Sequence, residues 1–167
     1  DMAESMLVGG KEGIQQFDWK DGQWQGSWVV KDHSFGEVRL GRAKKGNFIA
    51  GIEPIHGNVL SVYQINKKGP PTRTVLAEDL KQGHALACGD LLGRGSDQIV
   101  VGWRNQNEEG KTGIRLYEKE KKGSWKMHII ADNVMACEDL KLADLNGDGK
   151  LDIIAAGRAS HNVIIYW

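Results

Sequence analysis

A short apolar segment with a glycine near its end occurs four times in the 167-residue chain, and this repeat limits the possible folds more than any other feature. Its copies are MLVGG at 6–10, FIAGI at 48–52, IVVGW at 99–103 and IIAAG at 153–157. Equivalent glycines lie about 42 to 55 residues apart, which is the period of propeller blades with four strands each. The spacing therefore predicts a series of similar β units.

Other short segments recur around each glycine-containing segment. The next segment has an aromatic residue near its end, in the forms GIQQFDW, VLSVYQI, GIRLYEK and NVIIYW. A third type follows in three units, and a fourth type precedes the glycine-containing segment in the last three units. Short apolar or alternating runs between Gly, Asn, Asp and Lys clusters are typical of strands and turns. The chain is therefore expected to be all-β, a β-propeller of four-stranded antiparallel blades.

The predicted blade pieces span 1–32, 33–79, 80–132 and 133–167. They hold three, four, four and three strands, whereas a propeller usually needs at least four full blades to close. The chain is thus expected to form a partial β-propeller, roughly half of a larger ring. Open edges and an uncovered apolar blade face are a liability. The expected partner is therefore the remainder of the propeller or a second copy of the chain.

Charge and composition argue against several classes of function. Basic and acidic side chains balance at 22 each, which does not support nucleic-acid binding. No apolar run approaches the roughly 20 residues of a membrane span. The chain begins with Asp1 rather than Met, so an upstream segment is conceivable, and Cys88 and Cys137 are expected in the core. The compartment stays open, with an extracellular or periplasmic location slightly favoured.

The segment DLNGDGKLD at 144–152 places oxygen-bearing side chains at alternate positions. Four side-chain oxygens and one backbone carbonyl in a flexible loop suit Ca²⁺. The predicted ligands are Asp144, Asn146, Asp148, Asp152 and the carbonyl of Lys150. The loop is not an EF-hand, since its twelfth position is Ala155 and its flanks are expected to be strands. The alternative is a solvated turn without metal.

Two earlier turns are related to this loop but carry fewer acids. GDLLGRGSD retains Asp90 and Asp97 with Leu92 and Arg94 between them, and it is expected to be empty. GRAKKGN has no acidic residue and cannot bind calcium. Of the three related turns, DLNGDGKLD keeps a complete set of calcium ligands, GDLLGRGSD keeps part of it and GRAKKGN has lost it. This variation predicts that calcium stabilises a turn, and that any ligand or substrate binds elsewhere.

The glycine-containing strands, the DLNGDGKLD turn and the period together resemble the FG-GAP or VCBS-type β-propeller repeat over nearly the whole chain. The strings IEPIHGNVLSVY, GHALACGDL, GWR, MACEDLKLADLNGDGKLDIIAAGR and SHNVIIYW resemble more narrowly the propeller of aldos-2-ulose dehydratase-like proteins. That resemblance implies a ring of about seven blades and a sugar-converting site with a divalent metal. The repeat is specific for the fold and weak for the activity, because such propellers mostly bind or scaffold.

Strand order predicts which residues share a face of the disc. The calcium turn joins the first strand of a blade to the second, so the other connections near the central channel lie on the opposite face. Six residues before Asp144 stands Glu138, and six before Asp90 stands His84. The preceding blade offers Glu37 or His33 for the same position. These side chains are expected around the channel mouth, where propellers usually bind ligands.

The loops between second and third strands add polar residues to this face. They carry Glu53, His56 and Asn58, then Trp103 and Arg104, and then Arg158, His161 and Asn162. Trp103 could stack on a sugar ring, and the two arginines could hold a carboxylate, phosphate or oxyanion. The predicted ligand-binding residues are Glu37, His56, Trp103, Arg104, Asp139 and Arg158. The plainer interpretation is that each histidine is a surface or hydrogen-bonding residue, and that Glu37 and Arg39 form a structural ion pair between blades.

The first functional hypothesis is a metal-assisted lyase that acts on a carbohydrate-like substrate. His84, His161 and Glu138 are assigned the metal or base roles, and the metal is Zn²⁺ or Mg²⁺ in addition to Ca²⁺. The base would take the proton next to a carbonyl, the metal would hold the enolate oxygen, and an acid would help water leave. The alternatives are a non-catalytic propeller that binds a glycan or a protein, and a structural module of a larger enzyme.

Overall fold

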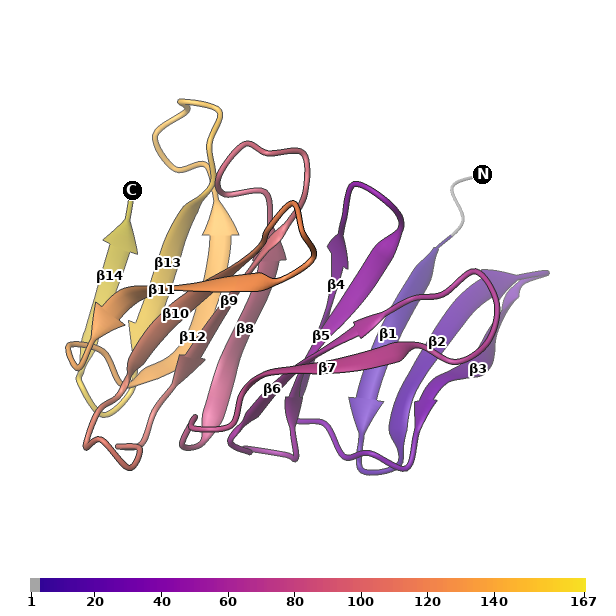
Figure 1. Cartoon of the computed structure of the whole chain (residues 1–167), viewed down its shortest axis with the longest axis horizontal. Coiled ribbons are helices and arrows are strands. Elements are labelled where there is room, and N and C mark those ends of the chain that lie inside the picture. The colour runs from indigo at the N-terminus through magenta and orange to yellow at the C-terminus, as the bar shows by residue number, and fades with distance from the viewer. Residues whose placement is uncertain (1–3) are drawn as a thin grey trace.

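The computed structural model describes residues 4–167, which form 14 β-strands and no helix, and therefore contain no helix able to cross a membrane (Figure 1). The strands are β1 (Ser5–Gly10), β2 (Gly13–Lys20), β3 (Gln23–Lys31), β4 (Glu37–Arg42), β5 (Asn47–Glu53), β6 (Val59–Gln64), β7 (Thr72–Ala77), β8 (Gly83–Gly89), β9 (Gln98–Trp103), β10 (Gly113–Lys119), β11 (Trp125–Asp132), β12 (Cys137–Ala143), β13 (Asp152–Gly157) and β14 (Asn162–Tyr166). The predicted all-β class is confirmed.

The strands form four antiparallel sheets in which each strand pairs with its neighbours in sequence. Sheet A is β1–β2–β3, sheet B is β4–β5–β6–β7, sheet C is β8–β9–β10–β11 and sheet D is β12–β13–β14. This grouping of three, four, four and three strands is the one that the repeats predict. The structure shows four separate sheets, and the ring that the sequence predicts is not closed by the strands described.

The sheets stand side by side in chain order, with their first strands adjacent (Figure 1). β4 contacts both β1 and β8, and β12 contacts β8. One apolar cluster fills each space between successive sheets, so each inner sheet is covered on both faces. The glycine-containing strands explain this arrangement, because a strand buried on both faces is apolar throughout rather than alternating.

β9 illustrates the double burial. All six of its residues are buried, with Ile99 and Val101 packed towards sheet B and Val100 packed towards sheet D. Gly102 allows sheet D to approach closely, because a Cβ at this position would lie 2.5 Å from Cys137 Sγ. The prediction that Cys137 is a core residue is confirmed. Cys88 is half-buried and packs against the cluster between sheets B and C.

The antiparallel pairing places the turns and loops on two opposite faces (Figure 1). The turns β4–β5, β8–β9 and β12–β13 lie on one face, which we call the turn face. The connections β5–β6, β7–β8, β9–β10, β11–β12 and β13–β14 lie on the other, which we call the loop face. The candidate calcium loop and the candidate ligand-binding residues therefore lie on opposite faces, as strand order predicts.

Candidate functional site

His84 and Glu138 occupy equivalent irregularities at the start of two neighbouring strands. The register of β8 against β9 shifts between Gly83 and Ala85, and that of β12 against β13 shifts between Cys137 and Asp139. In each case one residue lies opposite no partner, which is the arrangement of a β-bulge. A bulge re-aims its side chain, so both strands project a polar group towards the loop face. The predicted equivalence of the two positions is confirmed.

The Glu138 carboxylate is surrounded by cationic or potentially cationic groups. Its Oε1 atom lies 2.6 Å from Arg104 Nη1, 3.7 Å from Arg158 Nη1 and 4.0 Å from His84 Nε2. The hydrogen bond from Arg104 lowers the pKa of Glu138 below its ordinary value, and the charges of Arg104, His84 and Arg158 act in the same direction. The second oxygen, Oε2, is buried and has no hydrogen-bond partner in the protein.

His84 is held by one ring nitrogen, Nδ1, and by its ring face. Nδ1 lies 2.8 Å from the backbone oxygen of Glu138, so a proton on Nδ1 donates to that carbonyl and leaves Nε2 as an acceptor. The His56 ring stacks on the His84 ring with centroids 4.9 Å apart and an interplanar angle of 15°. This contact joins the β5–β6 loop to the first strand of sheet C. His84 Nε2 is thereby aimed at the Glu138 carboxylate.

Arg104 is fixed in place by the β7–β8 loop. Gln82 Oε1 accepts hydrogen bonds from Arg104 Nε at 3.1 Å and from Nη2 at 2.8 Å, which leaves Nη1 for Glu138. Gln82 and His56 both have positive φ, 54° and 52°, a region uncommon for residues other than glycine. Such backbone conformations are often found at ligand sites. We call the group His56, Gln82, His84, Arg104 and Glu138 the bulge cluster.

A hollow of about 250 Å³ adjoins the bulge cluster at the loop-face ends of sheets A, B and C. Its lining is Gly9, Gly10, Phe35, Gly36, Glu37, Ile55, His56 and His84. The structure thus brings together Glu37, His56 and His84, which the sequence assigns to one face. Glu37 also forms an ion pair with Arg39, at 2.9 Å between Oε2 and Nη1. Both residues belong to β4, so this pair lies within one strand and not between blades.

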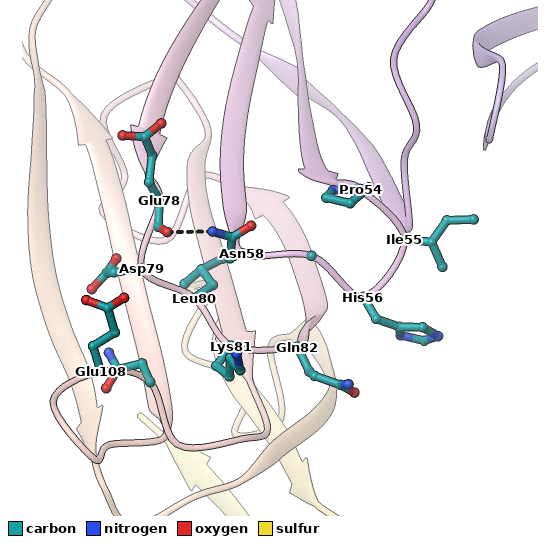
Figure 2. A pocket seen from close by; sticks show the side chains of 12 residues that line it. Pro54, Ile55, His56, Asn58, Glu78, Asp79, Leu80, Lys81, Gln82 and Glu108 are labelled. Atoms are coloured by element: carbon teal, nitrogen blue, oxygen red, sulfur yellow. Dashed lines mark hydrogen bonds between the residues drawn. The ribbon is translucent and has the colours of Figure 1, made fainter.

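A larger groove of about 670 Å³ continues from His56 across the loop face (Figure 2). It is formed by the loops β5–β6, β7–β8 and β9–β10. Figure 2 shows the carboxylates of Glu78, Asp79 and Glu108 on one side and the side chains of His56 and Gln82 on the other. Asn58 Nδ2 donates to the Glu78 carbonyl at 2.9 Å and ties two of these loops together. His56 lines both the groove and the hollow.

Three residues that the sequence assigns to the site lie apart from the bulge cluster. Trp103 is buried, donates from Nε1 to the Lys111 carbonyl at 2.8 Å and lies under the Arg115 guanidinium, so it is not placed to stack on a sugar. His161 is exposed in the β13–β14 turn, where its side chain makes no hydrogen bond or ion pair with His84 or Glu138. Asp139 points away and lies 3.6 Å from Lys141 Nζ.

The histidine and carboxylate groups do not form a preassembled metal site. Within residues 4–167 no group of three or more His, Cys, Asp or Glu side chains is arranged to hold a metal ion. The donor set of His84, Glu138 and Glu37 remains chemically suitable for Zn²⁺ or Mg²⁺, but its geometry is that of hydrogen bonds and ion pairs.

The β12–β13 loop has the oxygen-rich composition of a calcium loop and a hydrogen-bonded conformation of its own. Asp144 accepts from the backbone amides of Gly147, Asp148 and Gly149, and Asp152 accepts from that of Leu145. Hydrogen bonds from backbone amides lower the pKa of Asp144. The bond from Gly149 has the largest effect, and those from Gly147, Asp148 and Asn146 have smaller ones. The loop is therefore already folded around the Asp144 carboxylate. Its donor chemistry fits Ca²⁺, whose binding requires these oxygens to turn towards one point.

The equivalent β8–β9 turn is built as a support between sheets. Asp90 accepts from the amides of Arg94 and Gly95, as Asp144 does in its own loop. Asp97, the counterpart of Asp152, instead accepts from the Arg42 amide at 2.8 Å and pairs with its guanidinium at 3.4 Å. This turn thus uses its last acidic residue to hold sheet B.

Sequence reasoning missed the role of Glu53, which it placed on a loop. Glu53 ends β5 and is buried, and its carboxylate accepts from Ser61, from Tyr63 Oη at 2.7 Å and from Arg73 Nη2 at 2.6 Å. Burial raises the pKa of Glu53, but the bonds from Arg73, Ser61 and Tyr63 together hold it below the ordinary value. The alternation of Ser61 and Tyr63 along β6 was the available signal.

Comparison of the sequence with known proteins adds no assignment. No protein-family model matches the chain, and no curated protein matches it.

Proposed function

We propose that the chain is part of a β-propeller whose loop face binds a carbohydrate-like, polyhydroxylated small molecule at the bulge cluster. The observation that supports this most is the pair of bulges that aim His84 and Glu138 at each other beside the hollow. Ligand-binding residues on propellers and other β folds are commonly carried by such irregular strand ends. The resemblance to FG-GAP and VCBS repeats, and to dehydratase-like propellers, points the same way.

The propeller part of the proposal rests on how the sheets are stacked. Each sheet packs on the next through the same two faces, and the first strands of the four sheets lie together. A constant rotation from one sheet to the next is how blades generate a ring. We infer that further sheets of this kind complete a ring of about seven blades, with Ca²⁺ stabilising the β12–β13 turn of the last sheet here.

The chemistry of the cluster suits a hydroxylated ligand that carries a carbonyl or carboxylate. Arg104 and Arg158 supply positive charge and donors, while the partly exposed Glu138 carboxylate supplies an acceptor. His84 Nε2 is the proposed base that removes a proton next to a carbonyl. The protonated imidazole then gives this proton to the hydroxyl on the adjacent carbon, which leaves as water while a carbon–carbon double bond forms. A second divalent metal, Zn²⁺ or Mg²⁺, would polarise that carbonyl if bound beside His84 and Glu138.

A non-catalytic role in binding a glycan or a protein is the second candidate. It is favoured by the engagement of Glu138 with Arg104, because a carboxylate with a lowered pKa is a weak proton acceptor. In this case the groove of Figure 2 extends the binding surface from His56 to Glu108. The third candidate, a structural module of a larger enzyme, needs neither feature.

The test is a binding screen of the purified chain by ligand-observed NMR against neutral sugars, uronic acids and keto-sugars. His84→Ala and Arg104→Met should abolish binding of any hit. The free energy of unfolding of each variant should stay within about 1 kcal/mol of the parent value. His161→Ala is the matched control, since this histidine lies on the same face but outside the cluster. Loss of a hydroxyl from an active hit, measured with and without added Zn²⁺ or Mg²⁺, separates the lyase from the binding module.

Two results would contradict the proposal. Binding that persists in His84→Ala but disappears in His161→Ala would move the site to the β13–β14 turn. A His84→Ala protein that unfolds, together with no hit for the parent chain, would make the bulge cluster a structural link between sheets.

A further inference from the structure

The two outermost sheets each leave one apolar face uncovered, and the two faces differ in kind. On sheet A the uncovered face carries Met6 and Val8, which are 43% and 45% exposed, together with Trp19 and Trp24. On sheet D it carries Val163 and Ile165, which are 69% and 37% exposed, together with Ile154 and Ala156. Terminal units of repeat proteins normally have polar outer faces, so neither of these sheets is a cap.

The register shows which inner residues correspond to the uncovered face of sheet D. Ala156 lies opposite Val163 and Ile154 opposite Ile165, just as Gly102 lies opposite Ile114 and Val100 opposite Leu116 in sheet C. The sheet C residues are buried against sheet D. Sheet D therefore presents outward the same kind of face that sheet C uses to bind its next neighbour.

The uncovered face of sheet A corresponds to the side of an inner sheet that packs against the preceding sheet. Met6 lies opposite Phe17 in β2, as Ile99 lies opposite Tyr117 in β10. Ile99 is fully buried against sheet B, the preceding neighbour of sheet C. On sheet A the other face, with Leu7 and Ile14, is the one packed towards sheet B. Sheet A therefore presents the face that receives a preceding sheet.

We propose that these two faces are complementary docking surfaces and that a second copy of this chain occupies each of them, with its sheet D against sheet A of the first. Within the chain, each of the A–B, B–C and C–D contacts already joins a face like the uncovered face of sheet D to a face like the uncovered face of sheet A. A contact between sheet D of one copy and sheet A of another would continue this series. Such a head-to-tail contact is heterologous, so two copies close a ring if the rotation permits and otherwise extend further. The proposal concerns association and does not depend on a ligand at the bulge cluster.

The test is sedimentation velocity of the 167-residue chain over a range of concentrations, combined with one variant for each face. Val163→Asp places a charge on the sheet D face and Val8→Asp places one on the sheet A face, and each alone should weaken association about tenfold or more. Leu92→Asp is the control, since Leu92 is 43% exposed but lies in the β8–β9 turn away from both faces. Circular dichroism checks that each variant is folded.

Mixing the two variants provides the decisive measurement. The intact sheet A face of Val163→Asp can still bind the intact sheet D face of Val8→Asp, so the mixture should form a dimer that neither variant forms alone. The emission of Trp19 and Trp24 in Val163→Asp should shift to shorter wavelength on mixing. A parent chain that stays monomeric at high concentration, or association that both variants retain, overturns the proposal. Failure of the sugar screen leaves this result unaffected.

Discussion

At the scale of single residues, Glu53 is a buried carboxylate that several partners surround. Glu53 accepts from a hydroxyl, a phenol and a guanidinium, with His33 Nδ1 at 4.0 Å. A buried charge without such partners is strongly destabilising, which is why removal of one partner is informative. The bulge cluster follows the same logic at the surface, except that Glu138 keeps one oxygen without a partner.

We expect Arg73→Leu to lower the free energy of unfolding by about 2 kcal/mol at neutral pH, because Glu53 keeps its burial and loses its cation. In the parent the lowered pKa of Glu53 contributes stability that is present above its ordinary pKa and is lost as the pH falls through the folded value. In the variant the pKa rises, and protonation relieves the penalty. Urea unfolding at about pH 7.5 and about pH 4 should therefore show a smaller difference at the lower pH.

Lys141→Met is the control for this experiment, because it removes an exposed pair with Asp139 and should change stability by less than about 0.5 kcal/mol. An Arg73→Leu penalty that is unchanged or larger at low pH would mean that the effect is lost packing and not the isolated carboxylate.

At the scale of elements, turns at equivalent positions in the sheets have different roles. The β8–β9 turn holds sheet B through Asp97 and Arg42, and the β12–β13 turn keeps its acids within its own loop. The bulges at the other ends of β8 and β12 are both retained, but one carries a histidine and the other a glutamate. A repeated element thus places different side chains at one spatial position.

We expect Ca²⁺ to raise the melting temperature of the chain and chelation to lower it, because a ligand that binds only the folded state stabilises it. Asp148→Ala should abolish this response, and Asp90→Ala should retain it, since the β8–β9 turn lacks the other ligands. Thermal unfolding with and without chelator, together with metal analysis of dialysed protein, measures both. Equal calcium content in the parent and Asp148→Ala would refute the ligand assignment.

At the scale of the whole molecule, stability is unevenly distributed along the row of sheets. The inner sheets B and C are covered on both faces, and sheets A and D are covered on one. Local opening is easiest where few apolar contacts hold a strand. Association through the uncovered faces would change this distribution most at the two ends.

We therefore expect backbone amides of β5 and β9 to exchange slowest with solvent and those of β1 and β14 to exchange fastest at low protein concentration. Raising the concentration should increase protection in β13, β14, β1 and β2 while leaving β5 and β9 unchanged. Hydrogen exchange followed by mass spectrometry at two concentrations measures this. Uniform protection along the chain at low concentration would contradict the uneven distribution.

The sequence by itself determined the class of the fold, the grouping of the strands and the opposite placement of the candidate calcium loop and the polar residues. It could do so because strand periodicity and turn residues are local signals, and because an antiparallel order fixes which connections share a face. It also identified His84 and Glu138 as equivalent, since both stand six residues before an aspartate that begins a turn. These inferences need only counting along the chain.

The tertiary structure decided which of the polar residues meet. His84 stacks on His56 and Arg104 binds Glu138, while Trp103 is enclosed by sheet packing and the side chain of His161 makes no ion pair or hydrogen bond with the cluster. Glu53 became a core residue because Ser61, Tyr63 and Arg73 come from two other strands of the sheet. Contacts of this kind depend on the twist, the bulges and the distance between sheets, which bring together side chains from different strands.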